Sequence, residues 1–273
     1  MIPRAHITAW RRHTPWLTDA QVEQDLILSR ALVEIFAGPA LSSQLAFRGG
    51  TALHKLHLSP PARYSEDIDL VQVEPGPIGA VMTALHAQLD PWLGEPRRKQ
   101  SQGRMAFLYR FDSEIAPVTP LRLKIEVNTR EHFAVLGFTR KPLVVENPWF
   151  TGKADILTYE LEELLGTKLR ALYQRKAGRD LFDLGVALTG SPAPDAEKIM
   201  RCFLRHMDYV GATVSRAEFE ANLAGKLVDS EFLTDTGPLL APRSSQFDPF
   251  AAAQVVMTRL IARLPGEPWK GNR

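Results

Sequence analysis

The stretch from Ala46 to Leu70 places a double-glycine turn shortly before two carboxylates that are spaced by one residue. Residues 45–47 form a short apolar run that predicts a strand, and the apolar residues after Gly49 and Gly50 have helical spacing. Glycines let the backbone approach a phosphate closely, and the N–H groups at the start of a helix favour an anion. An ordinary strand-to-helix turn that needs a positive φ would look the same, so the glycines alone leave both interpretations open.

The two carboxylates fall in residues 67–71, which read as a strand with alternating faces. Asp67 and Asp69 then share one face, while Ile68 and Leu70 share the other. Paired carboxylates repel each other, and Mg2+ relieves that repulsion because it prefers a few carboxylates together with phosphate oxygens. An exposed edge strand with its acidic residues in water would carry the same pattern. Together, the turn and the carboxylates predict a site for a nucleoside triphosphate with one or two Mg2+ ions.

Strands and helices alternate in the first part of the chain, and helical patterns dominate from Thr158 onward. The clearest strand is 121–128, where apolar and polar residues alternate strictly. Residues 147–152 read as a junction. We therefore expect an α+β protein with two domains: residues 1–150 form a mixed β-sheet with flanking helices, and residues 151–273 form a mainly α-helical domain.

Composition limits the function classes. The 273 residues carry a formal charge of only +2, so any nucleic-acid binding must be local. Cys202 is the single cysteine, which rules out an internal disulfide, and the N-terminal residues lack the apolar core of a signal peptide. No apolar run approaches the roughly 20 residues of a membrane span. We expect a soluble, cytoplasmic protein with no membrane contact.

Two local groups of basic residues are candidates for binding a phosphate backbone. The segment 96–104 reads as a solvated hairpin loop or a cationic patch, and a second group surrounds the turn after residue 174. The second group is equally well a solvated surface. The basic residues are Arg97, Arg98, Lys99 and Arg104 in the first group, and Arg170, Arg175, Lys176 and Arg179 in the second.

Lys168 lies near the centre of an apolar stripe on a helix predicted over residues 161–175. An ammonium group buried without a partner costs several kcal/mol, so Lys168 should meet an anion. A lysine that runs its stem along the apolar face to water is the alternative, although the position in mid-helix argues against it. A triphosphate facing 49–51 in a cleft between the domains would supply the anion.

These residues resemble the AbiEii/AbiGii group of the nucleotidyltransferase superfamily, the toxins of type IV toxin–antitoxin and abortive-infection systems that include the mycobacterial MenT toxins. The resemblance extends from about residue 24 to about residue 188 and implies a nucleotidyltransferase-type sheet. It also implies that nucleotide and phosphate contacts come from one set of residues around the turn. The matching residues of that set are Gly49, Gly50, Thr51, Lys55, Arg63 and Ser65.

The resemblance assigns catalytic positions as well. Asp67, Asp69 and Glu126 would bind the metal, with Glu126 as the third carboxylate from a neighbouring strand. A solvent-facing strand with Lys and Glu paired would also explain Glu126. Lys168 matches a family lysine and Asp183 an acidic position, although Asp183 would also form an i,i+4 pair with Arg179.

Asp25 matches an acidic position in the family's leading helix, but we interpret it as a residue of a solvated helix face.

The function implied by the resemblance is transfer of a nucleoside monophosphate from an NTP to an acceptor. The acceptor would be the 3′ end of tRNA; pyrophosphate would be released and translation blocked. Such a toxin needs a cognate antitoxin protein encoded separately. A small-molecule nucleotidyltransferase acting on aminoglycoside-like acceptors and a non-catalytic nucleotide-binding module are the alternatives.

Overall fold

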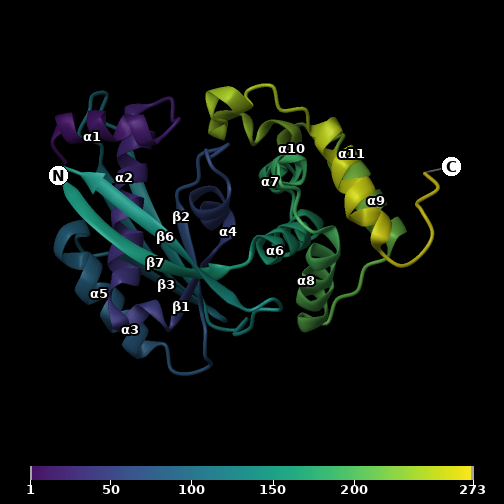
Figure 1. The fold of residues 1–273 in the computed structure, drawn as a ribbon, viewed down its shortest axis with the longest axis horizontal. Helices are drawn as coiled ribbons and strands as arrows, with labels where there is room; N and C mark the ends of the chain where they lie inside the picture. Colours follow the sequence, from purple (N-terminus) through teal and green to yellow (C-terminus); the bar gives the residue numbers. More distant parts are fainter. Residues whose placement is uncertain (1, 272–273) are drawn as a thin grey trace. The chain divides into compact units, whose positions relative to one another are not determined.

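The computed structural model describes residues 2–271, which divide into two compact units, Met1–Tyr159 and Glu160–Arg273 (Figure 1). The first unit carries all seven strands, and the second consists of helices. The division falls later than the junction expected near residue 150. The reason is that residues 150–159 continue the sheet as a strand instead of linking two domains.

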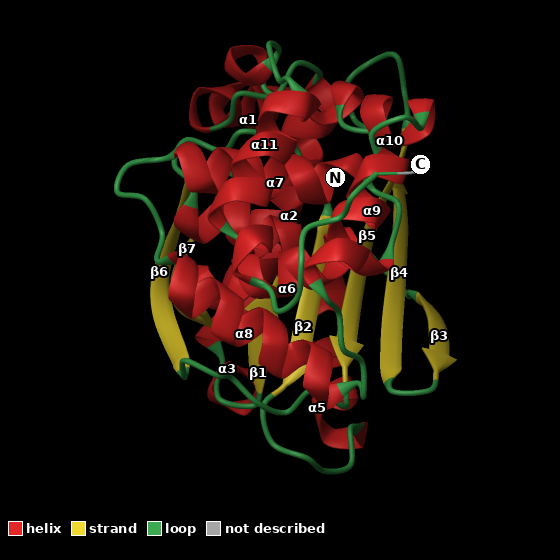
Figure 2. Ribbon diagram, turned by 90° about the vertical axis from the view of Figure 1, so that its right-hand side faces the viewer, coloured by secondary structure: helices red, strands yellow, loops and turns green. Residues whose placement is uncertain are grey.

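Seven strands form one mixed sheet in the order β3-β4-β5-β2-β1-β7-β6 (Figure 2). The pairs β2/β5 and β1/β7 are parallel, and the other neighbours are antiparallel. The central strand β2 therefore lies between β1 and β5. The strands are β1 (Leu45–Arg48), β2 (Asp67–Gln72), β3 (Arg97–Ser101), β4 (Arg104–Asp112), β5 (Pro120–Asn128), β6 (Phe138–Asn147) and β7 (Phe150–Tyr159).

Helix α2 (Asp19–Ala37) covers one face of this sheet, with α5 (Gly79–Leu93) beside it (Figure 1). A capping box at Thr18 fixes the start of α2. Phe107 and Tyr109 of β4 are fully buried on the covered face. The opposite face of β2, β4 and β5 consequently carries their polar residues. The remaining elements of this unit are α1 (Arg4–Trp10), η1 (Arg11–His13), α3 (Pro39–Ser42), α4 (Gly49–Ala52) and η2 (Leu53–His57).

Two segments are more regular than expected from the sequence. The segment 96–104 contains the strand β3, which pairs with β4 as a β-hairpin. All five residues of β3 are exposed. Residues 143–146, which the sequence alone marks only as a short strand, belong to the ten-residue strand β6 because β7 pairs with its whole length. In both cases the partner strand, and not the local composition, decides the structure.

The second unit is built around α6, which packs against α7 and α8, while α7 packs against α11. A Cβ at Gly166 would lie 2.8 Å from the Cβ of Cys202, so this glycine permits the close approach of α6 and α8. Cys202 is fully buried, and burial raises the pKa of its thiol to about 12. The helices are α6 (Leu161–Gln174), α7 (Gly178–Thr189), α8 (Ala196–Tyr209), α9 (Arg216–Lys226), α10 (Ser230–Thr234), η3 (Gly237–Leu239), η4 (Pro242–Ser244), α11 (Pro249–Arg259) and η5 (Ile261–Arg263).

Across residues 2–271, no helix combines the length and the apolar character that a membrane crossing requires.

Candidate active site

The strand register brings the three predicted carboxylates to one face of the sheet. In the parallel pair β2/β5, Asp67 lies opposite Lys124 and Asp69 lies opposite Glu126. Arg48, the last residue of β1, lies opposite Asp69 on the other side. Ile68, between the two aspartates, is fully buried in the core. The alternation read from the sequence is therefore present, and Asp67, Asp69 and Glu126 face away from α2.

The electrostatics of this face centre on Asp69. Burial raises the pKa of its carboxyl above the usual value, and the negative charges of Asp67 and Glu126 raise it further. The positive charges of Arg48 and Lys124 oppose these effects without cancelling them. Several like charges are thus held close together in a poorly solvated position. A cation bound here would relieve this repulsion.

A divalent metal fits two of the three carboxylates. Asp67 and Asp69 present side chains from one strand face, and the pKa of Asp69 is raised first by burial and then by the charge of Asp67. Glu126 is already paired, with its carboxylate 2.7 Å from Lys124 Nζ and 3.4 Å from Arg104 Nη1. This Lys–Glu pairing is the alternative weighed for Glu126 from the sequence. Within the described residues, no group of three His, Cys, Asp or Glu is gathered as metal ligands, so Glu126 would have to leave Lys124 to join.

The glycine turn lies directly against these carboxylates. Gly49 has a φ of +83°, and a Cβ on it would lie 2.3 Å from Asp69 Oδ2. A Cβ on Gly50 would lie 2.5 Å from Arg63 Nη2. Glycine is thus required at 49 by both conformation and space, whereas a side chain at 50 would displace the end of the Arg63 side chain. The turn and the Asp-x-Asp strand form one local structure, as the sequence predicts.

Thr51, Ser65 and Arg63 complete the surroundings of the turn. Thr51 Oγ1 donates a hydrogen bond to the Asp67 carbonyl oxygen at 2.5 Å and lies 2.8 Å from Ser65 Oγ. Arg63 is buried and donates to the Tyr64 carbonyl oxygen at 2.9 Å. Thr51 therefore ties the first turn of α4 to the start of β2, which fixes the glycines relative to the carboxylates.

Lys55 is held by Asp25. Its Nζ lies 2.8 and 2.7 Å from the two carboxylate oxygens and 2.9 Å from Ser29 Oγ. The Asp25 carboxylate also accepts hydrogen bonds from the indole N–H groups of Trp10 and Trp16. Asp25 is 3% exposed, so our interpretation of it as part of a solvated helix face is wrong. Lys55 lies next to the turn, with its ammonium group already neutralised.

Lys168 and Asp183 belong to the second unit, where they form a buried charge network. Lys168 lies in the interior, as its helical position predicts, and its Nζ is 2.8 Å from Asp183 and 3.0 Å from Asp180. Arg175 donates to both oxygens of Asp180. Burial would raise the pKa of Asp180, but Lys168 and Arg175 lower it below its ordinary value. The anions that Lys168 meets in this structure are thus two carboxylates of its own unit, and Asp183 pairs with Lys168 and not with Arg179.

Three residues of the second basic group, Arg170, Arg175 and Lys176, are engaged. Arg170 is buried and donates to the His206 carbonyl oxygen, and Arg175 is paired with Asp180 as described. Lys176 contacts the carboxylates of Asp229 and Glu231 at 2.8 and 3.1 Å. These pairings favour the interpretation of this group as ordinary surface and structural charge.

Sequence reasoning did not place Arg48, Arg104 or Asp180 in these two networks. It considered Arg104 only as part of a basic hairpin, and Lys124 only as an alternative partner of Glu126. Lys124 had a local signal, since it precedes Glu126 by two residues in a strictly alternating strand. Arg48 and Arg104 reach the carboxylates only through strand pairing, which no local pattern shows.

Comparisons with known proteins show the family and the fold of this chain. A family model described as "Nucleotidyl transferase AbiEii toxin, Type IV TA system" matches residues 30–253. The solved structure of MenT4, nucleotidyltransferase toxin Rv2826c from Mycobacterium tuberculosis H37Rv, has a TM-score of 0.64 at 17% identity, covering 97% of this chain and 91% of that one. A putative nucleotidyltransferase from H. pylori has a TM-score of 0.58 at 19% identity, covering 90% and 96%. At these identities the two structures establish a shared fold. The search of curated proteins gives no match.

Proposed function

We propose that this chain, which belongs to the AbiEii family of type IV toxin–antitoxin nucleotidyltransferases, transfers a nucleoside monophosphate from an NTP to the 3′ end of tRNA. The observation that carries the proposal is the shared face of Asp67, Asp69 and Glu126. Gly49 lies directly against Asp69, so the turn and the carboxylates form one site. Blocking the 3′ end of tRNA would stop aminoacylation and translation, which accounts for toxicity.

The transfer needs an acceptor hydroxyl to form a bond to the α-phosphorus while the bond from that phosphorus to the bridging oxygen breaks. Pyrophosphate leaves with the bonding electrons, and the hydroxyl proton passes to a carboxylate of the Asp67 and Asp69 pair. Mg2+ bound by these carboxylates would supply the positive charge that offsets the phosphates. The backbone of 49–51 would position the phosphates, held in place by the hydrogen bond from Thr51 to Asp67.

Lys168 and Asp183 have proposed roles in the same reaction. Lys168 would act as the catalytic lysine that the family resemblance assigns, and Asp183 would hold its ammonium group in position. Lys55 would act indirectly, because Asp25 neutralises its ammonium group. An antitoxin protein, encoded separately, would restrain the activity.

The experiment incubates the purified protein with total tRNA, Mg2+ and each α-labelled NTP in turn. Asp67→Asn is nearly isosteric and should abolish labelling, while Asp155→Asn, on an exposed position of β7, should leave it unchanged. Label on tRNA from the wild type supports the proposal and names the nucleotide.

Three other outcomes contradict it in different ways. Label on a small molecule but not on RNA would favour an aminoglycoside-type transferase. Metal-dependent NTP binding without turnover would favour a non-catalytic module. Equal labelling by wild type and Asp67→Asn would place the reaction elsewhere in the chain.

A further inference from the structure

A row of basic side chains extends from the carboxylates to the free edge of the sheet. In the β4/β5 register Arg110 lies opposite Arg122, Leu108 opposite Lys124 and Ala106 opposite Glu126, so these residues share the face of the carboxylates. The β3/β4 register then places Arg97 opposite Leu108 and Lys99 opposite Ala106, again on this face. We name as the basic ladder the six residues Arg97, Lys99, Arg104, Arg110, Arg122 and Lys124.

The neighbouring basic residue Arg98 lies on the opposite face. It pairs with Phe107, which is buried under the helices. Burial raises the pKa of Tyr109 on that same covered face, and Arg98 is the cation that opposes the rise. Strand β3 therefore separates its basic residues by face, with Arg97 and Lys99 on the carboxylate side and Arg98 on the other.

The outer residues of the ladder carry charge that the protein itself does not neutralise. Within residues 2–271, Arg97, Lys99 and Arg110 form no ion pair, and all three are exposed. The inner residues are weakly or partly paired: Arg104 lies 3.4 Å and Lys124 2.7 Å from Glu126, and Arg122 lies 3.6 Å from Glu66.

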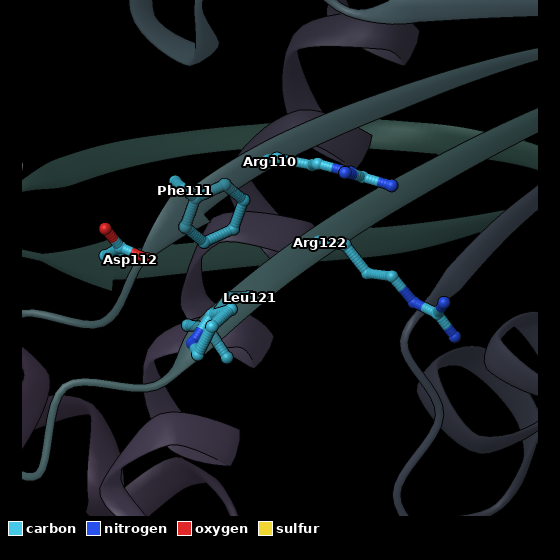
Figure 3. A pocket seen from close by; sticks show the side chains of 6 residues that line it. Arg110, Phe111, Asp112, Leu121 and Arg122 are labelled. Atoms are coloured by element: carbon cyan, nitrogen blue, oxygen red, sulfur yellow. The ribbon is translucent and has the colours of Figure 1, made fainter.

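Figure 3 shows Arg110 and Arg122 extending to the same side from neighbouring strands, away from Asp112. Together with Phe111, Asp112, Pro120 and Leu121 they line a surface pocket. The residues of the ladder that form no ion pair, Arg97, Lys99 and Arg110, thus lie on β3 and β4, farther from the carboxylates than β5.

We propose that the basic ladder binds the phosphodiester backbone of the acceptor RNA and leads its reactive end to Asp67 and Asp69. This inference rests on the proposed function. Three strand spacings separate β2 from β3, about 14 Å, and Arg97 and Lys99 lie about 7 Å apart along β3. The distance of about 14 Å from β2 to β3 is longer than a triphosphate requires. It suits a polyanion that extends beyond Asp67 and Asp69.

The side chains of the ladder face also indicate how the RNA is held. Leu108 and Ala106 lie between the cations, and among residues 97–101, 104–112 and 120–128 the face carries no aromatic side chain. A surface without stacking side chains binds phosphates and not bases. Binding should therefore tolerate changes of RNA sequence and should weaken steeply with salt.

The test measures binding of fluorescein-labelled unfractionated tRNA to the full-length protein between about 50 and 200 mM KCl. The variant Arg97→Gln/Lys99→Gln is compared with Arg98→Gln/Lys141→Gln, which removes the same charge from the covered face and from β6 at the other sheet edge. Two lost phosphate contacts should reduce the slope of log K against log salt by about 1.5 and the affinity at 0.1 M salt by at least about tenfold. The control should match the wild type.

Transfer kinetics separate this inference from the proposed function. Arg97→Gln/Lys99→Gln should raise the KM for tRNA about tenfold, with kcat unchanged, because the ladder positions RNA and takes no part in the chemistry. If this variant labels tRNA with the KM and the salt slope of the wild type, the ladder does not bind RNA. The proposed transferase activity would then still stand. An affinity loss for poly-L-glutamate but not for tRNA would also overturn it, in favour of an acidic protein. If tRNA binding depends on the ladder but no nucleotide is transferred, the proposed function is refuted and the inference about the ladder stands.

Discussion

Replacing Gly49 by alanine should disable the site while leaving the protein folded. The φ of +83° costs an alanine about 1–2 kcal/mol. The new Cβ would lie 2.3 Å from Asp69 Oδ2, about 1 Å closer than the 3.4 Å at which ordinary contacts begin. Since the carboxylate must move by that amount, and a 1 Å displacement of a reacting group costs about a hundredfold in rate, we expect kcat to fall by about that factor.

Gly137 provides the matched control, because it has the same φ of +83° and no atom within 4 Å of the position of a Cβ. Gly137→Ala measures the backbone strain alone, so the difference between the two variants isolates the contact with Asp69. Chemical denaturation gives the free energies of unfolding, and single-turnover transfer of labelled nucleotide gives the rates. Equal rates for Gly49→Ala and Gly137→Ala would refute the placement of the turn against a working carboxylate.

Further predictions concern the buried network and the turn. Lys168→Met removes the ammonium group that contacts the buried carboxylates of Asp183 and Asp180, although Asp180 keeps Arg175, so the free energy of unfolding should fall by about 3–5 kcal/mol in urea titrations; unchanged stability would mean that the Lys168 ion pairs contribute nothing. Because the pKa of Asp180 is lowered in the folded state, its stabilisation is present above the ordinary pKa of 3.8 and disappears as pH falls through the lower folded value. Asp180→Asn should remove that acid dependence from stability measured against pH, and an identical pH curve would contradict the assignment. Thr51→Val should cost about 1–3 kcal/mol by leaving the Asp67 carbonyl oxygen without its donor, and a loss of transfer activity larger than the loss of folded protein would show that the turn has shifted.

Features set by local pattern could be predicted from the sequence. The strict alternation of 121–128 identified the strand and the shared face of Lys124 and Glu126. The glycines at 49 and 50 indicated a turn before the Asp-x-Asp strand because the conformational freedom of glycine is a local property.

Features set by distant partners could not be predicted. Asp25 is buried because Trp10, Trp16 and Lys55 supply donors to it from 9 to 30 residues away. Residues 147–152 resemble a junction in the sequence, and Gly152 is one of the residues that suggest a turn, whereas a Cβ there would lie 3.0 Å from Val33 of α2. The glycine marks a close approach of helix and strand.

The same holds for Lys168. Helical periodicity placed it in the interior, but the identity of the anions depended on α7 folding back against α6. A sequence shows that a buried cation needs a partner, and only the packing of helices shows which one it takes.

Because Cys202 is buried, the rate at which its thiol is labelled reports how often the helical unit opens. A thiol reagent can react only when α8 separates from α6, because the side chain is fully buried where Gly166 brings these helices together. As the chain contains one cysteine, the labelling rate of the native protein counts openings of this unit and of nothing else. Added NTP, tRNA or antitoxin would each slow that rate if it stabilises the helices, so ligands of the toxin can be ranked without any assay of transfer.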